Sequence, residues 1–247
     1  MAHAFSTRLG GVSEGAYTSL NLSFAVGDRP ERVVENRRRL AGALGYDPQR
    51  MVCGRQVHGD KVAVVTLGEA GAGALGLQTA LPATDGLITG TPGLPLVAYF
   101  ADCVPVVFAD PENRAIALAH AGWRGTLQEI ARKALEKMTE AFGTHPPECL
   151  VSIGPAIGPC CYEVDHSVAA RFTRWGPTVG AKKSGKWFVD LWEANRQILL
   201  GAGVRPERIT VIKMCTACNR ELMFSHRRDG GETGRMAAVV MLRSEGV

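Results

Sequence analysis

Two histidines and one cysteine stand at the ends of predicted strands, where their side chains could bind a metal ion or take part in acid–base chemistry. His120 opens the turn His120-Ala-Gly-Trp-Arg-Gly125 after an apolar run. His58 lies in the turn Gln56-Val-His-Gly59, and Cys103 follows a second apolar run. Because α/β proteins often carry functional groups where strands end, we expect the three side chains to meet in one site.

Two imidazoles and one thiolate form a suitable ligand set for zinc, and three protein ligands leave a fourth position for water, as in catalytic zinc sites. The ligands are 45 and 17 residues apart, and no short metal-binding motif links them. A buried cysteine and hydrogen-bonded histidines near turns would give the same pattern. A third interpretation is a Cys103 nucleophile activated by His120 or His58. The charge of the neighbouring Asp102 would raise the thiol pKa, which disfavours that nucleophile.

Arginines in glycine-containing loops could bind an anion, phosphate above all, through paired hydrogen bonds. Arg124 is the first choice, because it lies four residues after His120 at a predicted helix start, where anions are favoured. Arg55 is the second choice. For each arginine taken alone, the alternative is solvated surface charge. Further loop residues of this kind are Arg227, Arg228, Arg235 and His226.

The seven cysteines do not indicate a disulfide scaffold in a chain of 247 residues. Cys215-Thr-Ala-Cys218 has the spacing of half a structural zinc site or of a redox pair. A four-cysteine site would need a second close pair, and the adjacent Cys160-Cys161 has a different spacing. We therefore interpret the first pair as partly buried thiols near the site and the second pair as packing residues.

The bulk composition is that of an ordinary soluble chain, with 46% hydrophobic residues, 21% charged residues and a net charge of +4. Scattered basic residues and few aromatics disfavour nucleic-acid binding. We recognise no signal peptide and no apolar run long enough to span a membrane, so we expect a cytoplasmic location without membrane contact. No repeat or linker divides residues 1–247, which predicts one domain; monomer and dimer are both compatible with the sequence.

Hydrophobic periodicity predicts helices and strands that alternate without strict β-α-β order. Helices are expected over residues 31–44, 126–142, 167–175 and 192–202. Strands are expected over residues 85–89, 94–110, 115–119, 150–153, 187–191, 209–214 and 236–242, with two short strands within residues 50–66 and a loop over residues 68–82. This pattern favours an α+β fold with mixed sheets over a doubly wound fold.

A set of segments spread over nearly the whole chain forms a joint pattern. The segments are Phe5-Ser-Thr-Arg-Leu-Gly-Gly-Val-Ser13, Ser19-Leu-Asn-Leu22, Asn36-Arg37, Gln56-Val-His-Gly59, Asp85-Gly-Leu-Ile-Thr89, Ala101-Asp-Cys103, His120-Ala-Gly-Trp-Arg-Gly125, Ile153-Gly-Pro155, Cys160-Cys-Tyr-Glu-Val164 and Phe224-Ser-His-Arg-Arg-Asp-Gly-Gly-Glu-Thr-Gly-Arg-Met-Ala237. Together they resemble the YfiH or laccase-domain family. Its members carry the names polyphenol oxidase, peptidoglycan editing factor and purine nucleoside phosphorylase.

The resemblance implies a single-domain sandwich of mixed β-sheets flanked by helices. It also implies a zinc site in which His58, Cys103 and His120 are both the ligands and the catalytic residues. Phosphorolysis of adenosine, inosine and S-methyl-5′-thioadenosine is implied, with purine nucleosides and phosphate as partners and with adenosine deaminase activity alongside. Copper-dependent oxidation of phenols is attributed to the family as well. The chain has no His-x-His pair, so a multicopper assembly has too few imidazoles here.

These observations lead us to expect a zinc-dependent purine nucleoside enzyme. Zinc would lower the pKa of bound water towards neutrality. Arg124, with Arg55 as second choice, would hold phosphate, and Asp102 or Asp85 would stabilise positive charge at the ribosyl centre. The aromatic residues that could stack on the base are Trp123 and Phe224.

Two alternatives to this enzyme come from different functional classes. The first is a hydrolase in which Cys103 and His120 act on an amide or a peptidoglycan precursor. The second is a metal-binding editing factor in cell-wall synthesis that catalyses no reaction. Metal content and activity towards nucleosides separate the three functions.

Overall fold

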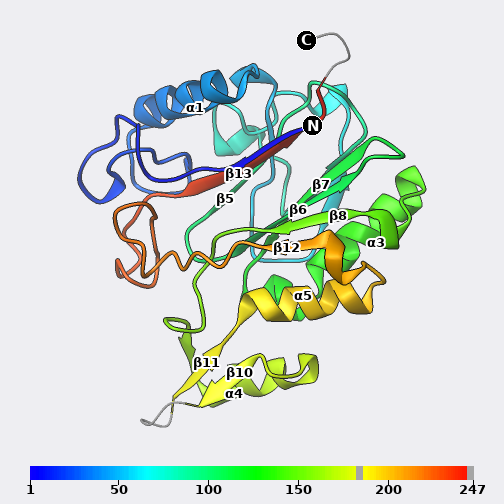
Figure 1. Ribbon diagram of the computed structural model, residues 1–247. Coiled ribbons are helices and arrows are strands. Elements are labelled where there is room, and N and C mark those ends of the chain that lie inside the picture. Colours follow the sequence, from blue (N-terminus) through cyan, green and yellow to red (C-terminus); the bar gives the residue numbers. More distant parts are fainter. Residues whose placement is uncertain (182–185, 244–247) are drawn as a thin grey trace.

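Two β-sheets pack face to face, and helices cover their outer faces (Figure 1). The computed structural model describes residues 1–181 and 186–243. Within these residues the strands form a four-stranded, a six-stranded and a small three-stranded sheet. Parallel and antiparallel neighbours occur together in the two large sheets. The predicted α+β sandwich of mixed sheets flanked by helices is therefore confirmed.

The four-stranded sheet contains both the first and the last strand of the described chain. Its order is β1 (Ala2–Phe5), β13 (Met236–Met241), β5 (Leu96–Phe100) and β2 (Val52–Cys53). The six-stranded sheet has the order β12 (Ile209–Val211), β8 (Leu150–Ile153), β6 (Val104–Asp110), β7 (Ala115–Ala121), β4 (Gly86–Thr89) and β3 (Val62–Val64). In the second sheet only the two outermost pairs are parallel.

Alternation of side chains along β7 divides the interior into two cores, because successive residues of a strand point to opposite faces. Ala117 and Ala119 belong to the core on the helical side, whereas Ile116 and Leu118 belong to the core between the sheets. The small alanine side chains let helix α3 (Ile130–Phe142) lie close to this strand. By the same alternation His120 points towards the four-stranded sheet and away from the helices.

Helices complete the outer layers. Helix α3 and helix α5 (Leu191–Gly201) contribute to the core on the outer face of the six-stranded sheet. Helix α1 (Pro30–Leu44) covers the four-stranded sheet. Its Arg37 is buried, donates hydrogen bonds to the carbonyls of Leu22 and Gly73, and lies 4.7 Å from the ring centre of Tyr99 on β5.

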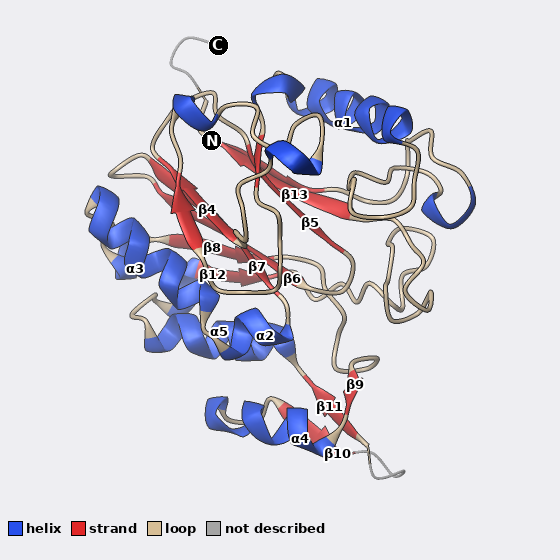
Figure 2. Cartoon of the chain, turned by 180° about the vertical axis from the view of Figure 1, so that it is seen from behind, coloured by secondary structure: helices blue, strands red, loops and turns tan. Residues whose placement is uncertain are grey.

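A small unit projects from one end of the sandwich (Figures 1 and 2). Its antiparallel sheet has the order β10 (Val179–Ala181), β11 (Trp187–Val189) and β9 (Glu163–Val164), and helix α4 (His166–Ala169) packs against β11. Of these three strands the sequence predicts only β11. Strands of two or three residues are too short for a period-two pattern to stand out.

Two predicted elements are each divided in the structure. The helix expected over residues 126–142 is split into α2 (Trp123–Leu127) and α3, with Glu129 between them at a φ of 58°. The strand expected over residues 94–110 is split into β5 and β6, with Asp102 between them at a φ of 88°. Left-handed backbone interrupts both elements, and apolar periodicity does not reveal it. The helix expected over residues 167–175 is a short α4 followed by 3-10 turns.

The chain crosses between the two large sheets at positions that matter for the site. The segment after β2 leads from the four-stranded sheet to β3 of the six-stranded sheet, and it contains His58. The segment after β5 makes the same crossing to β6, and it contains Cys103. Both residues therefore lie where the sandwich changes sheets, and His120 lies near the end of β7.

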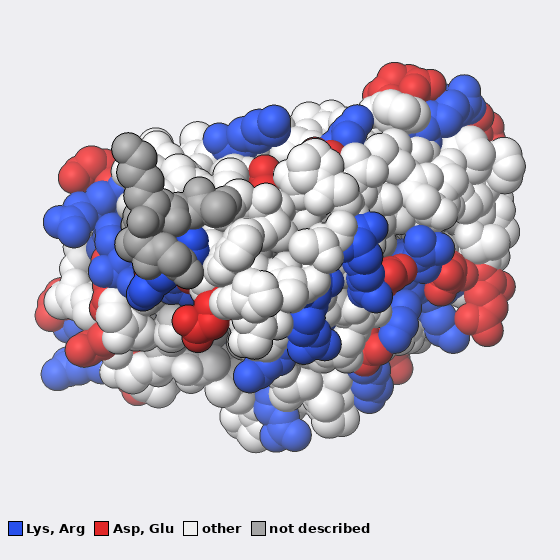
Figure 3. Space-filling view, turned by 90° about the horizontal axis from the view of Figure 1, so that it is seen from below, with Lys and Arg blue, Asp and Glu red and all other residues white. Residues whose placement is uncertain are grey.

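Charged side chains are distributed over the surface in small groups. Figure 3 shows Lys and Arg together with Asp and Glu on one face, separated by uncharged side chains. Among the residues that the structure describes, no helix has the length and apolar character needed to cross a membrane.

Candidate metal centre

His58, Cys103 and His120 converge on one point. One ligand atom of each residue lies within 4.8 Å of the corresponding atoms of the other two. The two imidazole rings lie 5.0 Å apart, centre to centre, in an edge-on arrangement with an interplanar angle of 66°. His120 is buried, Cys103 is half-buried and His58 is exposed. The group is thus closed on the side of the sheets and open on the other side, as a site that admits a substrate requires.

The carboxylate of Asp85 orders this group. It is fully buried just before β4 and accepts backbone N–H bonds from Val57, His58 and Gly59, each at 3.0 Å. One of its oxygens also lies 2.9 Å from Nδ1 of His120, and its backbone carbonyl accepts the N–H of His120 at 2.8 Å. These bonds lower the pKa of Asp85 although burial opposes the shift. One side chain therefore positions both histidines.

The bond to Asp85 also selects the tautomer of His120. The carboxylate accepts a hydrogen bond from Nδ1–H, so the neutral ring carries its lone pair on Nε2. In the metal-free protein burial lowers the pKa of His120, but the neighbouring Cys103 and Asp85 outweigh burial and raise this pKa to about 9, so the ring is protonated beside the thiolate. Histidines that bind zinc are commonly supported in this way: one ring nitrogen donates a hydrogen bond to a carboxylate, and the other ring nitrogen binds the metal ion.

Cys103 is prepared to act as a thiolate. Burial raises its pKa, but the imidazole of His120, by charge and hydrogen bonding, and that of His58 outweigh burial and bring the pKa down to about 6. The negative charge of Asp102, expected to raise this pKa, does not prevent the decrease. The carboxylate of Asp102 accepts hydrogen bonds from Oγ1 of Thr216 at 2.6 Å and from the N–H of Arg227 at 2.7 Å. A thiolate is the form of cysteine that binds a metal ion.

Gly122 leaves the room that the three residues need. A Cβ at this position would lie 2.9 Å from Sγ of Cys103 and 3.0 Å from Cδ2 of His58. The first contact is closer than real Cβ atoms make and the second is tighter than most, so a larger residue would displace the cysteine and press on the histidine. The glycine of the His120-Ala-Gly-Trp turn is required here for close approach.

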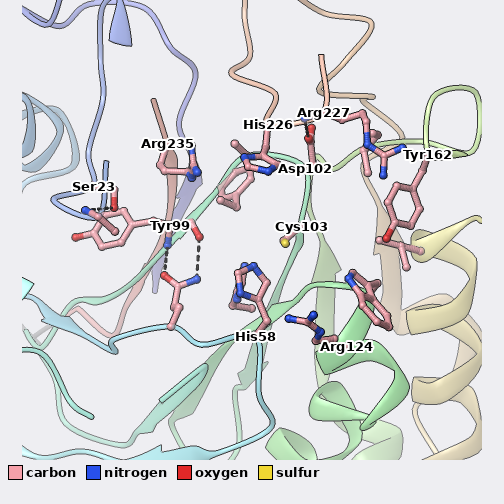
Figure 4. Close-up of a pocket in the computed structure, with 18 residues that line it drawn as sticks. Ser23, His58, Tyr99, Asp102, Cys103, Arg124, Tyr162, His226, Arg227 and Arg235 are labelled. Carbon is pink, nitrogen blue, oxygen red and sulfur yellow. Dashed lines mark hydrogen bonds between the residues drawn. The ribbon is translucent and has the colours of Figure 1, made fainter. Parts of the chain in front are cut away.

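A cavity of about 560 Å³ opens above the three residues. Figure 4 shows Cys103 in the middle of the cavity with His58 beside it. Arg235 and Arg227 lie on opposite sides, and Arg124 projects from helix α2. The volume is in the range of small-molecule sites, which is roughly 300–1,000 Å³.

The three arginines keep donors for a ligand. Arg227 donates to the carbonyl of Glu163, and Arg235 donates from Nη1 to the carbonyls of Thr233 and Gly234. Arg124 lies 4.9 Å from the ring centre of Trp123. Their partners are thus uncharged backbone oxygens and an aromatic ring. Because the hydrogen bonds of these guanidinium groups within the described residues go to uncharged oxygens, the arginines favour an anionic ligand.

Only some of the other predicted binding residues line the cavity. Arg124 and Asp102 line the cavity, as does Trp123. Arg55 is exposed and is not part of the cavity wall, and Asp85 lies behind His120 rather than in the cavity. Phe224 is fully buried in the core between the sheets. Asp85 therefore positions the histidines, and it does not face a substrate.

Several residues of the cavity wall were not predicted. Tyr162, Gln56 and Ser23 come from three separate loops. Gln56 is anchored by a pair of hydrogen bonds with the backbone of Tyr99, which fixes the loop that precedes His58. The position of Gln56 two residues before His58 was a usable signal. The sequence contains no comparable signal for Ser23 or Tyr162.

Replacing Asp85 by asparagine should weaken the metal centre, because it disturbs the loop that contains His58 and the support of the His120 ring. Each carboxylate oxygen accepts two hydrogen bonds, so an NH₂ group at either position would face N–H donors. Loss of such a support typically lowers metal affinity by about 10- to 100-fold. Competition for zinc between the protein and a chromophoric chelator measures the affinity. The relevant site is the one that is lost in Cys103→Ala. The control is Asp60→Asn, because Asp60 is half-buried, pairs with Lys133 and has no contact with the three ligands. Equal affinities of the two variants would contradict this role of Asp85.

Cys103 of the metal-free protein should react with iodoacetamide at unusually low pH. Because its folded pKa is about 6, the thiolate should be half formed near pH 6, remain above that pH, and be lost as the pH falls below it. Peptide mapping by mass spectrometry across pH 5–10 gives the midpoint. In His120→Ala the midpoint should move up towards the ordinary value of 9. An unchanged midpoint in this variant would remove the imidazole as the cause.

Comparison with known proteins identifies the family. The family model described as "Multi-copper polyphenol oxidoreductase laccase" matches residues 2–243. The chain is 44% identical over 248 residues to "Purine nucleoside phosphorylase YlmD" of Geobacillus stearothermophilus, which covers 97% of this chain and 89% of that protein. It is 38% identical to "Purine nucleoside phosphorylase YfiH" of Escherichia coli, with 98% and 94% covered. The crystal structure of YlmD from Geobacillus stearothermophilus superimposes with a TM-score of 0.95 at 43% identity, covering 98% and 92%. The chain therefore belongs to the YfiH family of laccase-domain proteins.

Proposed function

We propose that this protein is a zinc-dependent purine nucleoside phosphorylase. The observation that carries the proposal is a three-residue metal centre at the floor of a cavity whose walls carry three arginines. A metal site and an anion site then lie in one cavity, as a reaction between a nucleoside and phosphate needs. The relatives that cover most of this chain are named purine nucleoside phosphorylases.

The donor set fits zinc. Two neutral imidazoles and one thiolate are borderline-soft ligands of the kind that zinc prefers, and three protein ligands leave one position open. His58, Cys103 and His120 would hold the ion, and Asp85 would orient the two histidines. When bound, zinc supplies Lewis-acid chemistry, which polarises an oxygen ligand or activates water near neutral pH.

Phosphate would bind between the arginines of the cavity wall. A guanidinium group donates two parallel hydrogen bonds to a phosphate, which fixes both its position and its orientation. Arg124, Arg227 and Arg235 approach the cavity from helix α2 and from the loop before β13. Arg124 lies in the first turn of the short helix α2, which begins at Trp123 after Gly122, so the backbone adds positive potential at the same place.

The reaction follows from this placement. An oxygen of hydrogen phosphate attacks the anomeric carbon of the ribose, and the bond from this carbon to the purine nitrogen breaks. The purine leaves with the bond electrons and takes up the proton that the phosphate loses. Positive charge develops on the ribosyl group, and the buried carboxylate of Asp102 at the cavity wall would stabilise it. Trp123 offers an aromatic surface on which the base can stack.

Adenosine, inosine and S-methyl-5′-thioadenosine are the substrates that we propose, together with water-dependent deamination of adenosine. A cavity shared by a metal centre and a purine suits both reactions. Phenol oxidation by several copper ions is less consistent with this chain. In the described residues, the two groups that could hold a metal contain only two imidazoles between them, whereas a multicopper assembly needs many more.

A thiol hydrolase is the second function that a specific observation favours. Cys103, His120 and Asp85 form a series of thiol, imidazole and carboxylate, and the pKa of Cys103 is lowered. This is the arrangement of a cysteine nucleophile with its base and orienting acid. The exposed His58 beside the same sulfur and the open fourth position favour the metal instead.

Incubation of the purified protein with adenosine and phosphate should release adenine and ribose 1-phosphate, detected by chromatography. Omission of phosphate should stop adenine release, whereas hydrolysis would continue without it. Cys103→Ala should lose activity together with the zinc ion of the centre formed by His58, Cys103 and His120. Lost activity with zinc retained at this centre would identify a nucleophile. A zinc-loaded, folded protein that is inactive on all three nucleosides would overturn the phosphorylase and favour the editing factor.

Arg124→Ala should raise the KM for phosphate by about 10- to 100-fold, because a charged hydrogen-bond pair contributes roughly 1.5–3 kcal/mol. The matched control is Arg55→Ala, since Arg55 is exposed and does not line the cavity. Steady-state kinetics with phosphate as the varied substrate measure both constants. The assignment of Arg124 fails if the two variants have the same KM.

A further inference from the structure

Four cysteines outside the cavity meet at one point. One sulfur from each of Cys160, Cys161, Cys215 and Cys218 lies within 4.8 Å of the other three. Their sequence spacing led us to interpret Cys160-Cys161 as packing residues. For Cys160, which is exposed, that interpretation is wrong, whereas Cys161 packs against the core. The turn after Gly158 also brings both sulfurs next to the Cys215–Cys218 loop. Tertiary structure thus brings together two pairs that lie 54 residues apart in the chain.

The distances between the sulfurs suit a shared ion. Sγ of Cys218 lies 3.6 Å from Sγ of Cys160 and 3.4 Å from Sγ of Cys161. Four thiolates around zinc, each with a bond of about 2.3 Å, form a tetrahedron whose edges are about 3.8 Å. A disulfide requires about 2.05 Å. The observed separations are therefore close to the edges of a zinc–thiolate tetrahedron and far from a bonded pair.

The backbone around Cys215 is arranged to support a thiolate. The N–H of Gly158 donates to its sulfur at 3.2 Å, and the N–H of Cys218 donates to it as well. Arg228, whose charge is paired with Asp229, donates to the carbonyls of Thr216 and Ala217, the two residues between the cysteines, and so fixes the backbone of this loop. Such donors around the sulfurs offset the negative charge that four thiolates leave on a divalent ion.

We propose that Cys160, Cys161, Cys215 and Cys218 form a second, structural zinc site. Four cysteine ligands close the coordination shell, so this site has no open position for a substrate and differs in kind from the centre at His58. The position of this zinc site in the fold indicates its structural role. The four cysteines come from the loop after β8 and from the loop that connects β12 and β13, so a shared zinc ion holds these two loops together.

The second of these loops needs such a fastening. Residues 212–235 contain no helix or strand, yet they supply His226, Arg227 and Arg235 to the cavity. Loops of this length without secondary structure are uncommon in compact domains. Thr216, inside the Cys215–Cys218 loop, donates to Asp102 of the cavity wall. Zinc at the four cysteines would hold the cavity arginines and Asp102 in place without contacting a substrate.

Zinc content per chain tests the site. Full-length protein is purified with a non-thiol reductant, and zinc is measured by inductively coupled plasma mass spectrometry. Wild type should carry two zinc ions per chain. Cys160→Ser/Cys218→Ser replaces only the two exposed cysteines and should carry one. Cys103→Ala should also carry one, and the triple variant should carry none. The control is Cys53→Ser, whose buried sulfur bonds Oη of Tyr99, and it should keep two.

The same series separates this proposal from the proposed function. If the centre at Cys103 is empty, wild type and Cys103→Ala carry one zinc each, and the exposed double variant carries none. Cobalt(II) added to metal-free Cys103→Ala provides a second readout in a chain whose four cysteines are intact. It should show the visible bands and the strong sulfur-to-cobalt charge transfer of a tetrahedral four-thiolate site.

Three results would overturn the proposal. The first is a Cys160→Ser/Cys218→Ser variant that keeps the zinc content of wild type. The second is iron rather than zinc in the Cys103→Ala chain. The third is a disulfide that joins Cys218 to Cys160 or Cys161 in freshly purified, zinc-free protein, found by mass spectrometry after thiol blocking, because it would assign the cluster to redox chemistry.

Discussion

The carboxylate of Asp85 is the constraint on which the rest of the site depends. It lies at the start of β4 and satisfies three consecutive N–H groups of the loop that contains His58. It also holds the ring of His120 from the neighbouring strand β7. A buried carboxylate needs this many donors, because an unpaired charge in the interior is very costly. The same bonds that make its burial tolerable therefore fix the conformation of the loop, the tautomer of His120 and the open side of the metal centre.

Negative groups adjoin the two histidines, and positive groups line the cavity beyond them. The negative groups are the buried carboxylate of Asp85 and the thiolate of Cys103. The cavity beyond is lined by Arg124, Arg227 and Arg235, with Asp102 engaged by its own hydrogen bonds. A cation held by the three ligands and an anion held by the arginines would therefore occupy neighbouring positions in one cavity. The four-cysteine cluster lies outside this arrangement and supports the loop that carries two of the arginines.

The sequence predicts the α+β class, most of the large strands and the convergence of His58, Cys103 and His120, because apolar periodicity and residue types are local properties. It places Arg124 correctly at the start of a helix, since a glycine turn and a cation are visible in the chain. The left-handed backbone at Asp102 and Glu129 is not visible, so two elements are predicted as continuous. The role of Asp85 and the meeting of the four cysteines depend on loops that are distant in sequence. Such contacts follow from tertiary structure, which residue spacing does not contain.

The position of β13 sets the order in which this molecule can be completed. This strand is the last of the described chain, but it lies between β1 and β5 in the middle of the four-stranded sheet. His58 and Cys103 both lie on segments that leave this sheet. During synthesis all three metal ligands leave the ribosome more than a hundred residues before β13 does. A nascent chain therefore contains His58, Cys103 and His120 long before its four-stranded sheet is complete. Because this sheet positions His58 and Cys103, stable binding of a metal ion would be one of the last events of folding.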